Sequence, residues 1–267
     1  MNKIVLIAGD GVLPVEIARK LSEQGKNIFT MNMSNCNNSE DLRLYSEKFM
    51  SFRTPALGRA IREVKAWGAD ALIMAGGIHK KTIYFLSSML FDSVTRKVLR
   101  KSLHDDHSLL GAIVSEFESN GVKVLPYWQI IPEFLAPKGN LTQRVPSERE
   151  MYDVRYGCEI LQVTLPCSFG QAIVVADGAV VAVEAMEGTD AMIQRAGNLV
   201  KHGVLIKMMK KTQDLRYDLP TTGTRTLENM RKSGLTCLAV EAGRTIILEP
   251  EKFFALAEKY NIAVFGI

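Results

Sequence analysis

The sequence is poor in cysteine, and its four cysteines lie far apart. Cys36, Cys158, Cys167 and Cys237 form no C-x-x-C pair. Their spacing matches neither a zinc site nor the disulfide framework of a small secreted domain. We therefore expect reduced thiols in a cytoplasmic protein.

Long apolar runs and a strong net charge are also missing. No stretch approaches the roughly 18 apolar residues of a membrane-spanning helix, and the run at residues 4–8 is too short for a signal-peptide core. Peripheral attachment to a membrane stays open. The formal net charge of +4 is small for a nucleic-acid-binding protein, so we expect no nucleic-acid partner.

What the sequence does contain is the alternation of strands and helices that is typical of an α/β protein. In residues 1–128 the patterns predict strands at 3–8, 27–33, 70–75 and 122–125. Helices are expected at 13–24, 55–67, 83–103 and 109–118. We predict a Rossmann-like N-terminal domain with a mostly parallel sheet.

Four prolines between residues 126 and 146 interrupt this pattern. We predict a linker and a connecting helix over residues 129–164, with Ser147 as the helix N-cap. A second α/β domain with a mixed sheet is expected over 165–267, including a hairpin at Asp177-Gly178.

Two glycine-rich loops follow strands of the N-terminal domain. The first lacks the third glycine of a dinucleotide-binding fingerprint, where Pro14 stands, and the second strand ends without the required acidic residue. Glycine turns before a helix can still offer backbone amides to an anion. The candidate substrate contacts are Gly9, Gly11, Leu13, Gly76 and Gly77; purely structural tight turns are the alternative.

Acidic residues gather where the strand expected at 179–185 ends. Glu184 stands near the end of that strand, and Glu187 and Asp190 flank Gly188-Thr189 at a predicted helix start. Carboxylates, a hydroxyl and free amides in such a place can orient hydrated Mg²⁺ or meet phosphate oxygens. The alternative is ordinary capping, in which Thr189 caps the helix and Asp190 interacts with its dipole.

The segment at residues 207–221, KMMKKTQDLRYDLPT, mixes cations with aspartates. Leu219-Pro220 favours extended backbone, which would place Arg216 and Asp218 on one face. Cations beside a carboxylate suit a polyanionic substrate and a divalent metal. A solvated basic connector is the alternative.

Taken together, these stretches resemble the UDP-2,3-diacylglucosamine pyrophosphatases of the LpxI type, which act in lipid A synthesis. The resemblance covers nearly the whole chain. It is densest in residues 169–192 (FGQAIVVADGAVVAVEAMEGTDAM), in 203–221 and in 241–243 (EAG), and it is clear in the opening IAGDGVLPVEIA. The pair EGTDAM and QDLRYDLPT is far more specific than an isolated glycine motif.

The resemblance implies a Mg²⁺-dependent hydrolase that splits UDP-2,3-diacylglucosamine into UMP and 2,3-diacylglucosamine 1-phosphate. It also implies two α/β domains around a cleft and a homodimer. The expected location is the cytoplasmic face of the inner membrane of a Gram-negative bacterium, with membrane contact through the lipid substrate. The aspartate of the family's DLP motif is essential for turnover and corresponds to Asp218.

On this basis Asp218 and Asp190 are the catalytic candidates, and Glu187 joins them as a candidate metal ligand. The candidate substrate contacts of the C-terminal domain are Gln171, Gly188, Thr189, Lys207, Arg216 and Thr221. The chain departs from the family at Asp10, in place of a glycine, and at Lys80-Lys81, in place of arginine and proline. A lysine can still meet a phosphate as a point charge.

Two other classes of function stay open. A nicotinamide-dependent oxidoreductase would need the ribose-binding acid that is missing after the second strand. A non-catalytic binder or carrier of a nucleotide-linked lipid would share the fold and the cations, but would have less need of Asp190 and Asp218.

Overall fold

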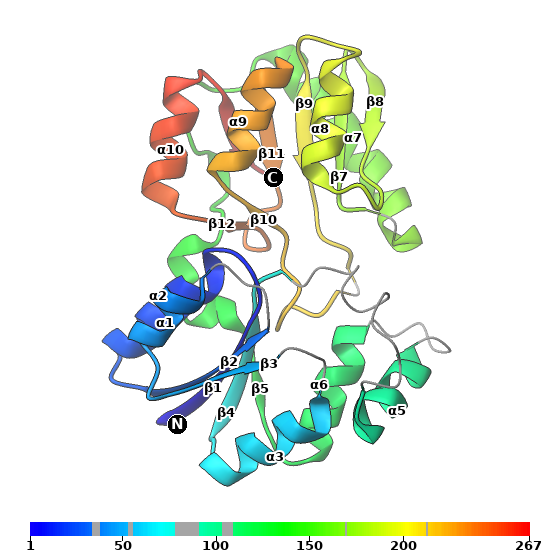
Figure 1. The fold of residues 1–267 in the computed structure, drawn as a ribbon. Helices are drawn as coiled ribbons and strands as arrows, with labels where there is room; N and C mark the ends of the chain where they lie inside the picture. Colours follow the sequence, from blue (N-terminus) through cyan, green and yellow to red (C-terminus); the bar gives the residue numbers. More distant parts are fainter. Residues whose placement is uncertain (34–37, 53–55, 78–90, 103–108, 169, 212) are drawn as a thin grey trace. The chain divides into compact units, whose positions relative to one another are not determined.

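The chain divides into two compact units, Met1–Ile131 (unit 1) and Pro132–Ile267 (unit 2). The computed structural model describes all residues except 34–37, 53–55, 78–90, 103–108, 169 and 212 (Figure 1). The departure at Lys80-Lys81 and residues 83–90 and 103 of the helix predicted at 83–103 lie outside the described residues. Within the described residues, no helix is long and apolar enough to cross a membrane.

Unit 1 is built on a five-stranded parallel sheet of order β3-β2-β1-β4-β5. The strands are β1 (Lys3–Ala8), β2 (Asn27–Met33), β3 (Lys48–Phe52), β4 (Ala71–Ala75) and β5 (Val124–Leu125). The chain order reverses beside β1, between β1 and β4. In open sheets of this kind, ligands bind beyond the carboxyl ends of the strands at such a switch point.

The helices of unit 1 form two groups, on opposite sides of the sheet in Figure 1. One group is α1 (Leu13–Glu23) and α2 (Ser39–Leu44); the other is α3 (Leu57–Trp67), α5 (Ser93–Ser102) and α6 (Leu109–Ser119). Helix α1 buries the face predicted from its spacing, namely Leu13, Ile17, Ala18 and Leu21. The predictions for β1, β2, β4 and α1 are therefore confirmed.

Unit 2 contains a six-stranded mixed sheet of order β6-β13-β11-β9-β7-β8. Its central strands β9 (Val204–Lys207), β11 (Cys237–Val240) and β13 (Ala263–Gly266) are parallel. The outer strands β6 (Gly139–Asn140), β7 (Ala172–Ala176) and β8 (Ala179–Val183) pair antiparallel with their neighbours. A separate parallel pair joins β10 (Thr221–Thr222) to β12 (Ile246–Ile247).

Both faces of this sheet are covered, because the buried strands carry apolar side chains on both sides. Helix α7 (Glu148–Thr164) packs on the face of the sheet that carries the side chains of Val204 and Ile206. Helices α8 (Thr189–Gly197), α9 (Thr224–Ser233) and α10 (Pro250–Lys259) pack on the opposite face with Leu205. The continuous apolar strands of buried parallel sheets follow this pattern.

Residues 132–164 belong to unit 2. The sequence had predicted this segment as a linker and connecting helix outside the second domain. Strand β6 pairs with β13, and α7 packs on β7 and β9 through buried Val154 and Leu161. Helix α7 begins with a capping box in which Ser147 and Glu150 each accept from the other's backbone amide. The prediction of Ser147 as N-cap is confirmed.

Candidate functional site

The two motifs of the C-terminal half converge on Lys207, the last residue of β9. The Lys207 ammonium donates a hydrogen bond to the backbone oxygen of Thr221 at 2.7 Å. Burial lowers the pKa of Lys207, while the carboxylates of Glu184 and Asp190 act against that shift. The DLPT segment and the turn before α8 therefore both reach the carboxyl end of β9.

Glu184 ties three elements together beside Lys207. Its Oε1 accepts from the Thr189 hydroxyl at 2.7 Å, and its Oε2 accepts from the Gln171 amide at 3.0 Å. These bonds join the end of β8 to the first residue of α8 and to the residue before β7. We call Gln171, Glu184, Thr189, Asp190, Lys207 and Thr221 the Lys207 cluster.

The sequence indicated Glu184 as part of the acidic stretch at residues 184–190, but it gave this residue no role of its own. It directly follows the apolar strand β8 (AVVAV) and stands shortly before the EGTD turn, and this position was the available signal. The neighbouring chain also constrains it, because a Cβ on Gly170 would lie 2.2 Å from the Glu184 backbone oxygen. Glycine at position 170 allows that close approach.

The start of α8 is not capped by Thr189. The N-cap is Gly188, with φ 83° and ψ 168°, and no side chain caps the helix. The Thr189 hydroxyl donates to Glu184 instead. The capping alternative is thus wrong for Thr189, whose hydroxyl belongs to the Lys207 cluster.

The two acidic residues of the EGTD turn are each paired with an arginine. Asp190 accepts from Asn229 Nδ2 at 2.9 Å, and its other oxygen lies 2.8 Å from the Arg225 guanidinium. Glu187 accepts from Arg195 at 2.8 Å, and that hydrogen bond holds the pKa of the Glu187 carboxyl below its usual value. A metal ion would have to replace these cations to bind either carboxylate fully.

Arg216 and Asp218 do not lie in extended backbone. Residues 215–217 form a turn in which the amides of Tyr217 and Asp218 reach the Asp214 backbone oxygen at 3.4 and 3.2 Å. The Asp214 carboxylate accepts from the Arg216 amide and guanidinium, and this pairing lowers the pKa of Asp214. Local side-chain bonding to the backbone has overridden the extended preference before Pro220, so the prediction of one shared face is wrong.

Asp218 is still held close to the Lys207 cluster by the chain. The side-chain amide of Gln213 (Nε2) donates to the Asp218 backbone oxygen at 2.6 Å, which constrains the backbone there. Thr221, whose backbone oxygen binds Lys207, follows Asp218 by a stretch that spans at most about 11 Å. The arrangement allows both motifs to act on one ligand.

In unit 1 the two glycine loops bind each other. The Gly9 amide donates to Ala75 O at 2.8 Å, and the Gly77 amide donates to Asp10 O at 3.0 Å. A Cβ on Gly76, which has φ +90°, would lie 2.6 Å from Pro14 Cγ. The amides of Gly9 and Gly77 are therefore not free donors, which favours the structural-turn alternative for them.

The other predicted contacts of unit 1 have different surroundings. Leu13 is 6% exposed and belongs to the core. Gly11 has φ +99° and space around it, and its backbone oxygen accepts from Asn38 Nδ2 at 2.8 Å. Asn38 also reaches Gly9 O at 3.1 Å, a contact that no sequence pattern indicated.

The acidic side chains near Lys207 form a sparse donor set for Mg²⁺. In the part of the chain that the structure describes, no three His, Cys, Asp or Glu side chains are grouped to hold a metal ion. Mg²⁺ often takes only one or two protein carboxylates and completes its shell with water and substrate phosphate oxygens. Carboxylates such as those of Asp218 and Asp190 are of the type used in that sparse mode, although the Asp190 carboxylate is paired with Asn229 and Arg225 in this structure.

Two protein-family models match the chain in sequence order. The LpxI N-terminal domain matches residues 3–134, and the LpxI C-terminal domain matches residues 137–265. The chain belongs to the LpxI family. The resemblance noted in the sequence is confirmed.

A curated relative of this LpxI family member comes from Caulobacter vibrioides and is named UDP-2,3-diacylglucosamine pyrophosphatase LpxI. The two are 30% identical over 287 aligned residues, which cover 100% of this chain and 98% of the relative. The match extends over both units. It includes the segments that form the Lys207 cluster.

Two solved structures resemble this LpxI family member distantly. The biotin carboxylase subunit of pyruvate carboxylase is 16% identical, with a TM-score of 0.28 over 70% of this chain and 39% of that one. The biotin carboxylase domain of Hydrogenobacter thermophilus 2-oxoglutarate carboxylase is 15% identical, with a TM-score of 0.29 over 74% and 41%. The chain spans less than half of either structure, and similarity this low carries no argument.

Proposed function

We propose that this LpxI family member hydrolyses the pyrophosphate bond of UDP-2,3-diacylglucosamine to give UMP and 2,3-diacylglucosamine 1-phosphate. The observation that supports this most is the convergence of the EGTD turn and the DLPT segment on Lys207. The name of the Caulobacter vibrioides relative supports the same substrate.

The proposed chemistry follows from the charge of the bond. A pyrophosphate diester carries two negative charges that repel an incoming nucleophile, so catalysis consists mainly of neutralisation and positioning. Lys207 and Arg216 would supply positive charge to the phosphate oxygens. The Thr189 hydroxyl would donate a hydrogen bond to them only if it leaves Glu184. The backbone of Gly188 and Gln171 would line the same place.

Asp218 would orient the attacking water and accept its proton. Asp190, held by Asn229, would complete the acidic side of the site. Bound Mg²⁺ would neutralise phosphate charge and make coordinated water more acidic. We expect Asp218 and Asp190 to hold it, with Glu187 contributing only if it leaves Arg195.

The decisive test is release of UMP from UDP-2,3-diacylglucosamine by the purified protein with Mg²⁺, and its loss with a chelator. Asp218→Asn should lower kcat by at least about a hundredfold, because it removes a proton acceptor while keeping the shape. Melting temperature and affinity for the uridine nucleotide should change little.

The matched control is Asp177→Asn, the same chemical change at the opposite end of β7. Asp177 has φ 55°, which asparagine also adopts readily. This variant should keep full activity. Substantial turnover by Asp218→Asn would refute the assignment of Asp218.

The same assay distinguishes an enzyme from a carrier, because a carrier would bind the nucleotide lipid tightly and release no UMP. A homodimer and a peripheral location at the inner face of the inner membrane are proposed from the resemblance alone. Light scattering after size exclusion checks the first. Fractionation of cells checks the second.

A further inference from the structure

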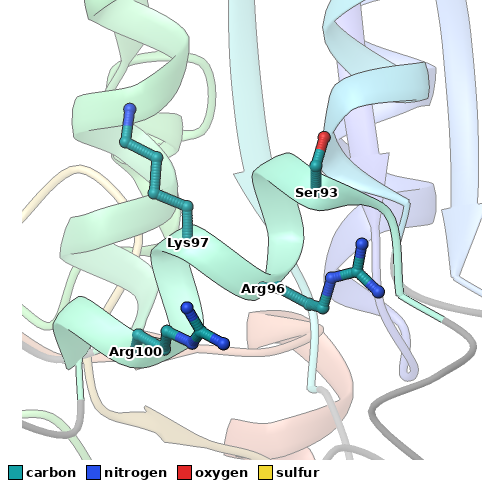
Figure 2. A pocket seen from close by; sticks show the side chains of 4 residues that line it. All are labelled: Ser93, Arg96, Lys97 and Arg100. Carbon is teal, nitrogen blue, oxygen red and sulfur yellow. The ribbon is translucent and has the colours of Figure 1, made fainter.

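Helix α5 of unit 1 presents a cationic surface. Arg96, Lys97 and Arg100 line an open hollow of about 550 Å³ together with Ser93. Figure 2 shows the guanidinium groups of Arg96 and Arg100 extending from α5 in the same general direction, with Lys97 extending away from them. We call these three cations the α5 basic face.

The α5 basic face is poorly neutralised by its own unit. Lys97 is 62% exposed, and its ammonium lies 3.9 Å from the Glu116 carboxylate. Arg96 and Arg100 have no ion pair with any residue that the structure describes. By contrast, Arg19 on α1 pairs with both Glu16 and Glu23. Like charges one helical turn apart repel each other, so an external anionic surface would relieve that repulsion.

The opposite side of α5 holds the helix in place. Thr95 and Val98 are 6% and 3% exposed, and α5 contacts α3 and α6. The Thr95 hydroxyl and amide both donate to the Asp92 carboxylate, at 2.7 and 2.8 Å. The three cations therefore project from a fixed helix.

We propose that the α5 basic face docks the protein onto a membrane surface rich in anionic phospholipid. This partner rests on the proposed function, because a doubly acylated substrate resides in a membrane. The hollow is open and its cations are exposed, so one small anion would gain little over water. A surface with many phosphates attracts all three cations at once. Each basic residue close to an anionic membrane raises the membrane partition coefficient by about fivefold.

The test is co-sedimentation with vesicles of phosphatidylcholine alone and of phosphatidylcholine mixed equally with phosphatidylglycerol. The protein should bind the anionic vesicles, and added salt should weaken that binding. Arg96→Gln with Arg100→Gln should reduce partitioning by about 25-fold, which is two fivefold steps. The matched control is Arg231→Gln with Lys232→Gln, which removes the same charge from exposed positions on α9.

Several results would overturn the docking proposal. These are equal binding to both kinds of vesicle, an equal loss in both double variants, or tighter binding to double-stranded DNA than to anionic vesicles. Melting temperatures of both variants check that they fold.

Activity on substrate dissolved in neutral detergent separates this proposal from the proposed function. Both double variants should match the unsubstituted protein there, because neither changes a residue of the Lys207 cluster. Loss of detergent activity in the α5 variant alone would show that the face contacts substrate and would overturn docking. An unsubstituted protein that binds anionic vesicles but releases no UMP in detergent would refute the proposed function and leave the docking result standing.

Discussion

At the scale of single residues, the balance of charge around Lys207 governs what the candidate site can do. Its ammonium is held by Thr221 O and faces the charges of Glu184 and Asp190. A lysine whose burial lowers its pKa depends on such carboxylates to stay protonated. Glu184 thus acts as a positioning residue for Thr189 and Gln171 and as an electrostatic partner of Lys207.

Substitution of Glu184 should change the pH dependence of activity. In Glu184→Gln the carboxylate that raises the pKa of Lys207 is removed, so burial lowers that pKa further. Lys207 would then lose its proton at a lower pH, and the alkaline limb of the kcat/KM profile should move to lower pH. Asp177→Asn should leave the profile unchanged. Identical profiles for Glu184→Gln and the unsubstituted protein would contradict this role.

At the scale of elements, the two glycine loops of unit 1 pack so closely that side chains have no room. A Cβ on Gly9 would lie 2.5 Å from Gly77 O, and one on Gly76 would lie 2.8 Å from Asp10 O. The glycine pattern correctly predicted tight turns at the ends of β1 and β4. It could not show that backbone amides of one turn donate hydrogen bonds to the other, because these bonds depend on the pairing of Asp10 with Gly77.

Neighbouring glycines of this loop should respond differently to alanine. Gly76→Ala should destabilise unit 1 by about 1–3 kcal/mol, because it combines a positive φ with contacts under 3 Å. Gly77→Ala should stay within about 0.5 kcal/mol, because nothing lies within 4 Å of a Cβ there. Denaturation followed by tryptophan fluorescence reports on unit 1, which contains both Trp67 and Trp128. Equal effects of the two substitutions would show that crowding at Gly76 is unimportant.

Helix α2 and strand β3 show why some elements were not predicted. Helix α2 has six residues and buries only Leu42, so it has no apolar period to detect. Strand β3 lies at the edge of the sheet and buries only Phe52. Strand β3 pairs with β2, and helix α2 packs against both α1 and β2. The local sequence does not encode these tertiary contacts.

At the scale of the whole molecule, the boundary between the units decides which fragments fold. Residues 132–164 supply β6 at one edge of the sheet of unit 2, and α7 over one of its faces. Without α7, the apolar side chains of Ile173, Val175 and Ile206 would lose their cover. The surface left exposed would be far too apolar for a stable domain.

Two fragments test this boundary. Residues 132–267 alone should give a cooperative thermal transition by circular dichroism and a dispersed amide NMR spectrum. Residues 165–267, which begin where the sequence predicted the domain, should lack that transition or aggregate. A folded 165–267 fragment would show that residues 132–164 are a linker, as the sequence predicted, and not part of the second domain.

The sequence by itself determined the features that depend on near neighbours. These are the buried face of α1, the hairpin at Asp177-Gly178, the capping of α7 and the motifs that identify the family. Each arises from residues a few positions apart, so a local pattern records it. Only the tertiary structure decided that Glu184 accepts hydrogen bonds from both Thr189 and Gln171, and that Lys207 donates one to Thr221. It also decided that the backbone amides of Gly9 and Gly77 donate hydrogen bonds within unit 1. Those contacts join segments that are brought together by sheet pairing and packing, which no local pattern specifies.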